Sequence, residues 1–253
     1  MVDQQLAKSF ENIGEEYDRY RPGFPDAAAD AILPAPVDAV LDLGAGTGKF
    51  TALLTGRAER VIAVEPSAQM LDVLRAKLPE VETYAAGAER IPLADASVDA
   101  VTVAQAFHWF ERDAACAEIR RVLVPGGVLG LLWNRADRSC TWDLACSRIA
   151  HPAYRREDGE LLPEPEPDEL PGFVFASRAA IRWTERITRA DYISRWLTVS
   201  SFLAADEARR AEMLAAVSAV LDTDPETAGR GEFDLPLVTE VFVYRAGYAA
   251  ALT

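Results

Sequence analysis

Three alternate glycines, Gly44, Gly46 and Gly48, stand between an apolar run and a segment with helical periodicity. Glycine lets the backbone turn tightly and lets a ligand approach the main chain closely. Glu65 ends the next apolar run, 21 residues after Gly44. In doubly wound nucleotide sites, an acid at this position accepts hydrogen bonds from both ribose hydroxyls. The glycines and Glu65 together predict a nucleoside pocket.

Other uses of a glycine-rich turn fit the sequence less well. A phosphate-binding GxxxxGK[ST] loop would need glycine at Leu43 and a hydroxyl residue at Phe50. A dinucleotide fingerprint, GxGxxG, would place its third glycine at Lys49, whose side chain would obstruct close helix–strand packing. A purely structural turn stays open as an alternative. We therefore favour a nucleoside that carries no pyrophosphate.

Short apolar runs alternate with helical periodicity from residue 37 to residue 134. This alternation is typical of a doubly wound α/β fold, a mostly parallel sheet with helices on both faces. We expect strands at residues 39–43, 61–64, 81–85, 100–104 and 128–133. Among the intervening helices, we expect one to begin near Gly48, a second to be capped by Ser67 and a third to end before Pro125.

We expect one domain over residues 1–253, with four parts: N-terminal cap helices (1–36), a cofactor-binding core (37–135), an insertion or lid (136–179), and strands and helices that complete the sheet (180–253). The acidic, proline-rich residues 157–171 are either a solvated excursion or a lid over the site. In the last part we expect a strand at 180–187, helices at 190–197 and 206–221, and a strand or hairpin at 233–244.

The composition limits the classes of partner. A net charge of -14 disfavours nucleic acid, because phosphate backbones are bound largely through Lys and Arg. No run reaches the roughly 18 apolar residues of a membrane span, and the polar N-terminus does not resemble a signal peptide, so we expect a cytoplasmic protein without a membrane partner. Three cysteines without CxxC spacing and two histidines predict no metal site. A homodimer stays possible.

Several segments, in order, resemble the class I S-adenosylmethionine-dependent methyltransferases. They are FENIGEEYDRYRPGFP (10–25), LDLGAGTGKF (41–50), VIAVEPSAQML (61–71), GAERIPLADASVDAV (87–101) and EIRRVLVPGGVLGLLWN (118–134). The subgroup resembled contains ubiquinone/menaquinone-pathway C-methyltransferases and trans-aconitate-type O-methyltransferases. The resemblance implies a Rossmann-like, mostly parallel seven-stranded sheet with an antiparallel edge strand and a helical cap. It also implies S-adenosylmethionine as cofactor and S-adenosylhomocysteine as product.

The resemblance also implies roles for particular residues. Asp42, with the backbone of Gly44 and Gly46, would face the methionine part of the cofactor, and Gln105 would lie beside it. Glu65 would accept hydrogen bonds from the ribose diol. The adenine would be flanked by Pro66 and Met70 and contacted near Ala88 and Glu89. Tyr17 and Arg21 would come from the closing helix, with Arg21 reaching the cofactor carboxylate. For Met70, on the apolar stripe of its helix, we favour core filler over a specific ligand, whereas Arg21 could equally form a surface ion pair.

The acceptor pocket should lie outside the carboxyl ends of the fourth and fifth strands. His108, near the end of the fourth, is the candidate catalytic base or substrate orienter, with a structural histidine as the alternative. Arg135, after the fifth, could orient an anionic substrate. The letters Gln-Ala-Phe-His at 105–108 lack the Asn/Asp-Pro-Pro-aromatic motif of amino-methylating nucleic-acid enzymes.

We therefore expect methyl transfer to a small organic molecule by in-line displacement, with an O, C or N acceptor left open. A carboxylate acceptor needs no base, whereas a phenol, an alcohol or an acidic carbon does. Two rivals stay open: a nucleoside-binding protein of the same fold without turnover, and a nicotinamide-dependent oxidoreductase.

Overall fold

The computed structural model describes residues 14–150 and 169–247. These residues form a seven-stranded sheet in the order β3-β2-β1-β4-β5-β7-β6. The strands are β1 (Val37–Leu43), β2 (Ala58–Val64), β3 (Glu82–Tyr84), β4 (Val98–Ala104), β5 (Leu123–Ala136), β6 (Phe173–Thr188) and β7 (Glu232–Ala246). Strands β1 to β5 pair in parallel, and β7 is antiparallel to both β5 and β6. The predicted fold class, with antiparallel pairing at one edge, is confirmed.

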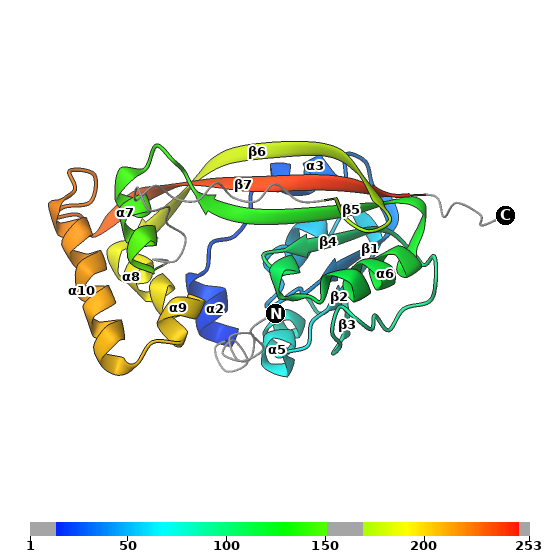
Figure 1. Ribbon diagram of the computed structural model, residues 1–253, viewed down its shortest axis with the longest axis horizontal. Coiled ribbons are helices and arrows are strands. Elements are labelled where there is room, and N and C mark those ends of the chain that lie inside the picture. Colours follow the sequence, from blue (N-terminus) through cyan, green and yellow to red (C-terminus); the bar gives the residue numbers. More distant parts are fainter. Residues whose placement is uncertain (1–13, 151–168, 248–253) are drawn as a thin grey trace.

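Helices cover the sheet and one end of its long strands (Figure 1). They are α2 (Gly14–Tyr20), α3 (Asp26–Ile32), α4 (Thr51–Leu54), α5 (Ala68–Lys77), the 3-10 turn η1 (Phe107–Trp109), α6 (Arg112–Val122), α7 (Thr141–Ala150), α8 (Arg189–Leu197), α9 (Ser200–Leu203) and α10 (Glu207–Thr223). Ser67 caps α5 as predicted, since its hydroxyl accepts from the backbone N–H of Met70. The helix expected after Gly48 is only the short α4.

Strand β1 shows why the central strands are continuous apolar runs. Its side chains alternate between two buried clusters, Leu41 and Leu43 on one face and Val40 on the other. Ile119 of α6 belongs to the first cluster and Ile32 of α3 to the second. A parallel strand covered on both faces must be apolar at nearly every position.

Strands β5, β7 and β6 run well past the other strands and carry a helical cap (Figure 1). Pairing of β5 with β4 ends at Leu132, whereas its pairing with β7 continues to Ala136. Strand β6, expected at 180–187, begins at Phe173 because it pairs with β7 along nearly its whole length. The stretch 233–244 lies within the single strand β7, so a hairpin there is wrong.

The cap has a hydrophobic core of its own. Trp142 of α7, Tyr192 and Trp196 of α8, and Phe202 of α9 are buried there with Phe233 of β7. Helix α2 contacts both α8 of the cap and α5 of the main sheet (Figure 1). The cap therefore stands at the carboxyl end of β5, and α2 links it to the sheet. Of the acidic segment 157–171, residues 157–168 lie outside the described residues.

Asp42, at the end of β1, is held by the elements on either side of it. One carboxylate oxygen accepts a hydrogen bond from Thr51 of α4 at 2.6 Å, and the other accepts one from Thr102 of β4 at 2.9 Å. Burial raises the pKa of Asp42 to about 6, although the two hydroxyl groups act in the opposite direction. Asp42 thus closes the glycine turn by binding the residue where α4 begins.

This raised pKa predicts a pH dependence of stability. Between pH ~4 and ~6 the folded state keeps a proton that the unfolded state releases, so the free energy of unfolding falls as pH rises through this window. The shift of about two pKa units corresponds to up to about 3 kcal/mol. Asp42→Asn should remove this slope in urea unfolding measured from pH ~4 to ~7. Asp38→Asn, an exposed change on the same strand, should follow the wild type. Parallel curves for Asp42→Asn and wild type would contradict the assignment.

Candidate cofactor and acceptor site

The glycine turn connects β1 to α4 at the carboxyl edge of the sheet. Gly44 and Gly46 have φ of +70° and +57°, in the left-handed region that favours glycine. A Cβ on Gly44 would lie 2.6 Å from the Cβ of Ala106, so this position is closed to any side chain. A Cβ on Gly46 would meet only the Met70 sulfur, at 3.8 Å. The main chain at Gly46 is therefore the uncrowded part of the turn.

Glu65 lies directly beside this part of the turn. One carboxylate oxygen accepts from the backbone N–H of Gly46 at 3.1 Å, and the other from that of Ser67 at 2.9 Å. The side chain is buried, which raises its pKa, while the two N–H groups act to lower it. Each oxygen of a carboxylate can accept a second hydrogen bond. Glu65 therefore keeps the capacity to accept from two ligand hydroxyls.

Pro66 and Met70 follow Glu65 at the start of α5. Pro66 is exposed, whereas Met70 is buried and its sulfur lies near Gly46. Both readings of Met70 thus agree with its position, since it fills the core and also lies beside the open part of the turn.

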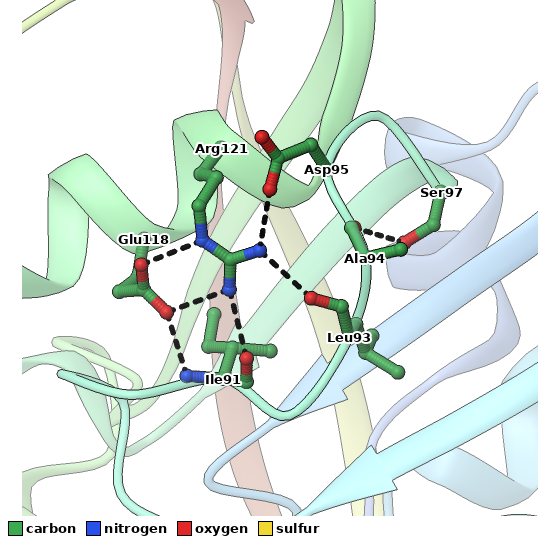
Figure 2. Close-up of polar contacts among 7 residues, drawn as sticks. All are labelled: Ile91, Leu93, Ala94, Asp95, Ser97, Glu118 and Arg121. Carbon is green, nitrogen blue, oxygen red and sulfur yellow. Dashed lines mark hydrogen bonds and ion pairs between the residues drawn. The ribbon is translucent and has the colours of Figure 1, made fainter.

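The segment after β3, which carries Ala88 and Glu89, is held in place by α6 (Figure 2). The guanidinium of Arg121 donates to the backbone carbonyls of Ile91 and Leu93, at 2.8 Å and 2.7 Å. Arg121 also binds Glu118, whose carboxylate accepts from the N–H of Ile91 at 2.8 Å. Sequence reasoning missed this role. The signal was an acid and an arginine three residues apart on one helix.

Ala88 and Glu89 differ in their surroundings. Ala88 is buried in the main core. Glu89 is exposed, and its carboxylate accepts from the N–H of Glu111, the residue that precedes α6, at 2.9 Å. An acid at a helix N-terminus is favourably placed. The structure thus gives Glu89 a local partner, and its contact with the adenine stays a prediction.

Gln105 has an unusual backbone just after β4. Its φ is +57°, a left-handed value that costs a non-glycine residue conformational energy. Its N–H donates to Leu132 of β5 at 2.9 Å, and its side chain donates to the carbonyl of Asn134 at 3.4 Å. These contacts fix a sharp bend at the carboxyl ends of β4 and β5, where a site was expected.

His108 follows this bend in η1. Its side chain is exposed to solvent, but neighbouring protein partly desolvates the imidazole. This desolvation, followed by the positive charge of Arg135, lowers the pKa of His108 to about 4. The imidazole is therefore neutral at neutral pH, the form that can accept a proton. Arg135, in turn, interacts with Glu240 of β7 at 3.7 Å and stacks over Trp133.

Tyr17 and Arg21, from α2 and the residue following it, lie against the cap. Arg21 donates to the carbonyl of Thr198 at the end of α8, at 2.7 Å, and its guanidinium lies over the Tyr17 ring. The Nε of Arg21 is buried without a hydrogen-bond partner among the described residues. Burial lowers the pKa of Arg21, and nearby Arg195 lowers it further, against the opposing influence of Tyr17.

The described parts of the chain lack two further kinds of feature. Residues 14–150 and 169–247 contain no group of three or more His, Cys, Asp or Glu side chains that could hold a metal ion. Within the same ranges, no helix has the length and apolar character needed to cross a bilayer.

The comparisons with known proteins point to one family. The family described as "Methyltransferase domain" matches residues 41–131, from β1 to β5. An uncharacterized methyltransferase of Mycobacterium tuberculosis is 40% identical over 237 residues, which cover 93% of this chain and 95% of that protein. A ubiquinone/menaquinone biosynthesis C-methyltransferase of Rubrivivax gelatinosus is 43% identical over 90 residues, covering 35% and 36% of the two chains.

A solved structure agrees with these sequence relatives. The protein from Anaeromyxobacter dehalogenans, described as a candidate type II methyltransferase, superposes with a TM-score of 0.65 at 27% identity, covering 90% of this chain and 97% of that one. The [4+2]-cyclase SpnF superposes with a TM-score of 0.54 at 14% identity over 98% and 97%, which shows the fold alone. The family assignment therefore rests on the long match to the mycobacterial relative and on the site: this chain belongs to the class I S-adenosylmethionine-dependent methyltransferase family.

Proposed function

We propose that this protein binds S-adenosylmethionine across the glycine turn and Glu65 and transfers its methyl group to a small organic acceptor. The contact between the N–H of Gly46 and the carboxylate of Glu65 carries this proposal. It joins an uncrowded stretch of backbone to an acid that can still accept from a ribose diol. The negatively charged acceptor oxygens of a pyrophosphate would find a carboxylate and no cationic side chain in this contact.

The bound cofactor would supply an electrophilic methyl group on a sulfonium. Glu65 would hold the ribose, and Ala88 with Glu89 would border the base, on a segment that Arg121 fixes. Asp42, through its hydrogen bond with Thr51, would keep the glycine turn closed. The contribution of these residues is positioning and exclusion of water, which can supply roughly 7–11 kcal/mol of a barrier.

A small molecule fits the acceptor side better than a nucleic acid. The net charge of -14 works against binding a phosphate backbone. The residues after β4 include the aromatic rings of Phe107 and Phe110, packed edge to face, with His108 between them in the chain. His108 would take a proton from an acceptor that must lose one.

Calorimetry tests the cofactor assignment directly. The wild type should bind S-adenosylhomocysteine and not NADH. Isotopic methyl transfer from labelled S-adenosylmethionine into a metabolite extract should then yield a labelled small molecule. Binding of NADH alone would contradict the assignment, and binding of S-adenosylhomocysteine without any labelled product would support a protein without turnover.

Glu65→Gln should weaken binding of S-adenosylhomocysteine by about 1–3 kcal/mol, the range for a charged hydrogen-bond partner. Glutamine keeps the size of the side chain but loses the charge and one acceptor oxygen. Glu59→Gln, an exposed change on β2, the strand that precedes Glu65, serves as the matched control and should leave the affinity unchanged. Equal affinities of the two variants, measured by calorimetry, would remove Glu65 from the site.

His108→Gln should lower the methyl-transfer rate by about 10²–10⁴-fold if the imidazole takes a proton from the acceptor. Because the pKa of His108 is about 4, the wild-type imidazole is neutral from pH ~5.5 to ~8, and the loss should be the same throughout that range. This loss is measured as the rate of label incorporation at saturating cofactor. A rate within about twofold of wild type would assign His108 a structural role.

A further inference from the structure

The cap contains a cluster of buried polar atoms that lack hydrogen-bond partners among the described residues. Their residues interact with one another, and the atoms are Arg21 Nε, Asp143 Oδ2, Glu185 Oε2, Arg195 Nη1 and Trp196 Nε1. Buried polar groups in folded proteins are nearly always paired, so a group of unpaired ones in one place calls for an explanation. We name Arg21, Glu185, Arg195 and Trp196 the cap cluster.

Direct contacts place three members of the cap cluster at the last turn of α8. The Arg195 guanidinium lies 5.5 Å from the centre of the Trp196 ring. Arg21 donates to Thr198, three residues after Arg195, and the charges of the two arginines act on each other. Glu185 joins the group through its electrostatic interaction with Arg195.

The strand register places Glu185, one member of the cap cluster, on the side of the sheet where the acceptor is expected. Trp183 of β6 lies opposite Leu237 of β7, which pairs with Ala136, the last residue of β5. Glu185 is two residues further along β6, so it lies beyond the carboxyl end of β5. Glu185 also interacts with Lys49, the residue that follows the glycine turn. Glu185 therefore connects the cap cluster with the end of β5, where the acceptor is expected, and with the residue after the glycine turn.

The charges and donors around the cluster favour an anion. Among the described residues, the cations that belong to the cluster or interact with a member of it are Arg21, Arg195 and Lys49, and the carboxylates are Asp143 and Glu185. The cluster thus has one cation more than it has carboxylates. Of the atoms without partners, three are N–H donors and two are carboxylate oxygens.

Arg195 is the donor best suited to a ligand. Its side chain is 11% exposed, and its other terminal nitrogen lies 4.0 Å from Asp143, whose Oδ1 accepts from the Tyr192 hydroxyl at 2.6 Å. Asp143 and the aromatic rings of Tyr192 and Trp196 thus fix the guanidinium while Nη1 stays unpaired. A planar guanidinium held in this way matches the geometry of a carboxylate.

We propose that the cap cluster binds the carboxylate of an organic-acid acceptor, with Arg195 and Trp196 as its donors. Glu185 accepts a hydrogen bond from a hydroxyl or amine of the same molecule. Arg21 stays the predicted partner of the cofactor carboxylate. The inference rests on the proposed function, because it assigns the substrate class of the same site.

The test is calorimetric titration of the protein, with and without S-adenosylhomocysteine, using benzoate, salicylate, octanoate and 3-hydroxybutyrate and the primary amide of each. We expect at least one carboxylate to bind at least about tenfold more tightly than its amide, because the amide lacks the charge. Arg195→Met should abolish this preference and keep the affinity for S-adenosylhomocysteine within about twofold. Arg209→Met, which removes an exposed arginine of α10, is the matched control and should behave as wild type.

Three outcomes would overturn the inference. The first is that no carboxylate binds more tightly than its amide. The second is that Arg195→Met keeps the preference for the carboxylate. The third is that Arg195→Met loses S-adenosylhomocysteine affinity to the same extent, which would mean that Arg195 binds the carboxylate of the cofactor. If Arg195→Met does not fold, Trp196→Phe decides, because it removes the indole N–H and keeps an aromatic ring in the cap core. It should weaken carboxylate binding at least about threefold, as loss of one hydrogen bond does, and unchanged binding would overturn the inference. Failure of wild type to bind S-adenosylhomocysteine would instead contradict the proposed function.

Discussion

The arrangement of the site depends on how the turn between β1 and α4 is held. Asp42 binds Thr51 where α4 begins, and Glu65 binds the N–H of Gly46 from the neighbouring strand. Gly44 also donates to Val64, the last residue of β2. The turn is thus attached to its own strand, to the next strand and to its own helix. A backbone fixed on three sides presents its N–H and carbonyl groups in one arrangement, as pre-organised binding requires.

The opposite wall of the site depends on the length of three strands. The polar residue Asn134 continues β5 past the end of β4 and binds the carbonyl of Gly23 and the hydroxyl of Thr239. Trp183 donates to the same hydroxyl. This network connects the segment after α2, the end of β5 and both partner strands. The cap therefore stands on the same sheet that carries the glycine turn.

The sequence allowed the central strands to be predicted because a parallel strand buried on both faces is an unbroken apolar run. The spacing between Gly44 and Glu65 predicted that the glycine turn and Glu65 belong to one site, and the structure places the carboxylate of Glu65 in contact with the N–H of Gly46. Residues whose position depends on distant pairing could not be found in this way. Strand β6 begins with the apolar residues Phe173, Val174 and Phe175, but Val174 and Phe175 are exposed, so burial did not make this run part of a recognisable periodic pattern.

The other misses have different physical causes. The contact of Arg21 with Thr198 joins residues 177 apart, and no local pattern indicates it. The left-handed backbone of Gln105 is imposed by its bonds to β5, because glutamine has no preference for that conformation. Arg121 supports a neighbouring segment by binding backbone carbonyls. Every residue has such a carbonyl, so the sequence does not indicate which ones Arg121 binds. Each of these belongs to tertiary structure rather than to a motif.

The separate core of the cap has a consequence for local unfolding of the protein. Trp142, Tyr192 and their neighbours pack with one another and not with the clusters around β1. Regions with their own apolar core tend to open as cooperative units at less than the cost of global unfolding. The hinge of such an opening would lie in β5, β7 and β6, the strands shared by both regions. A molecule in contact with the turn and the cap at once would raise the protection of amide hydrogens in α8 while leaving those of β1 almost unchanged.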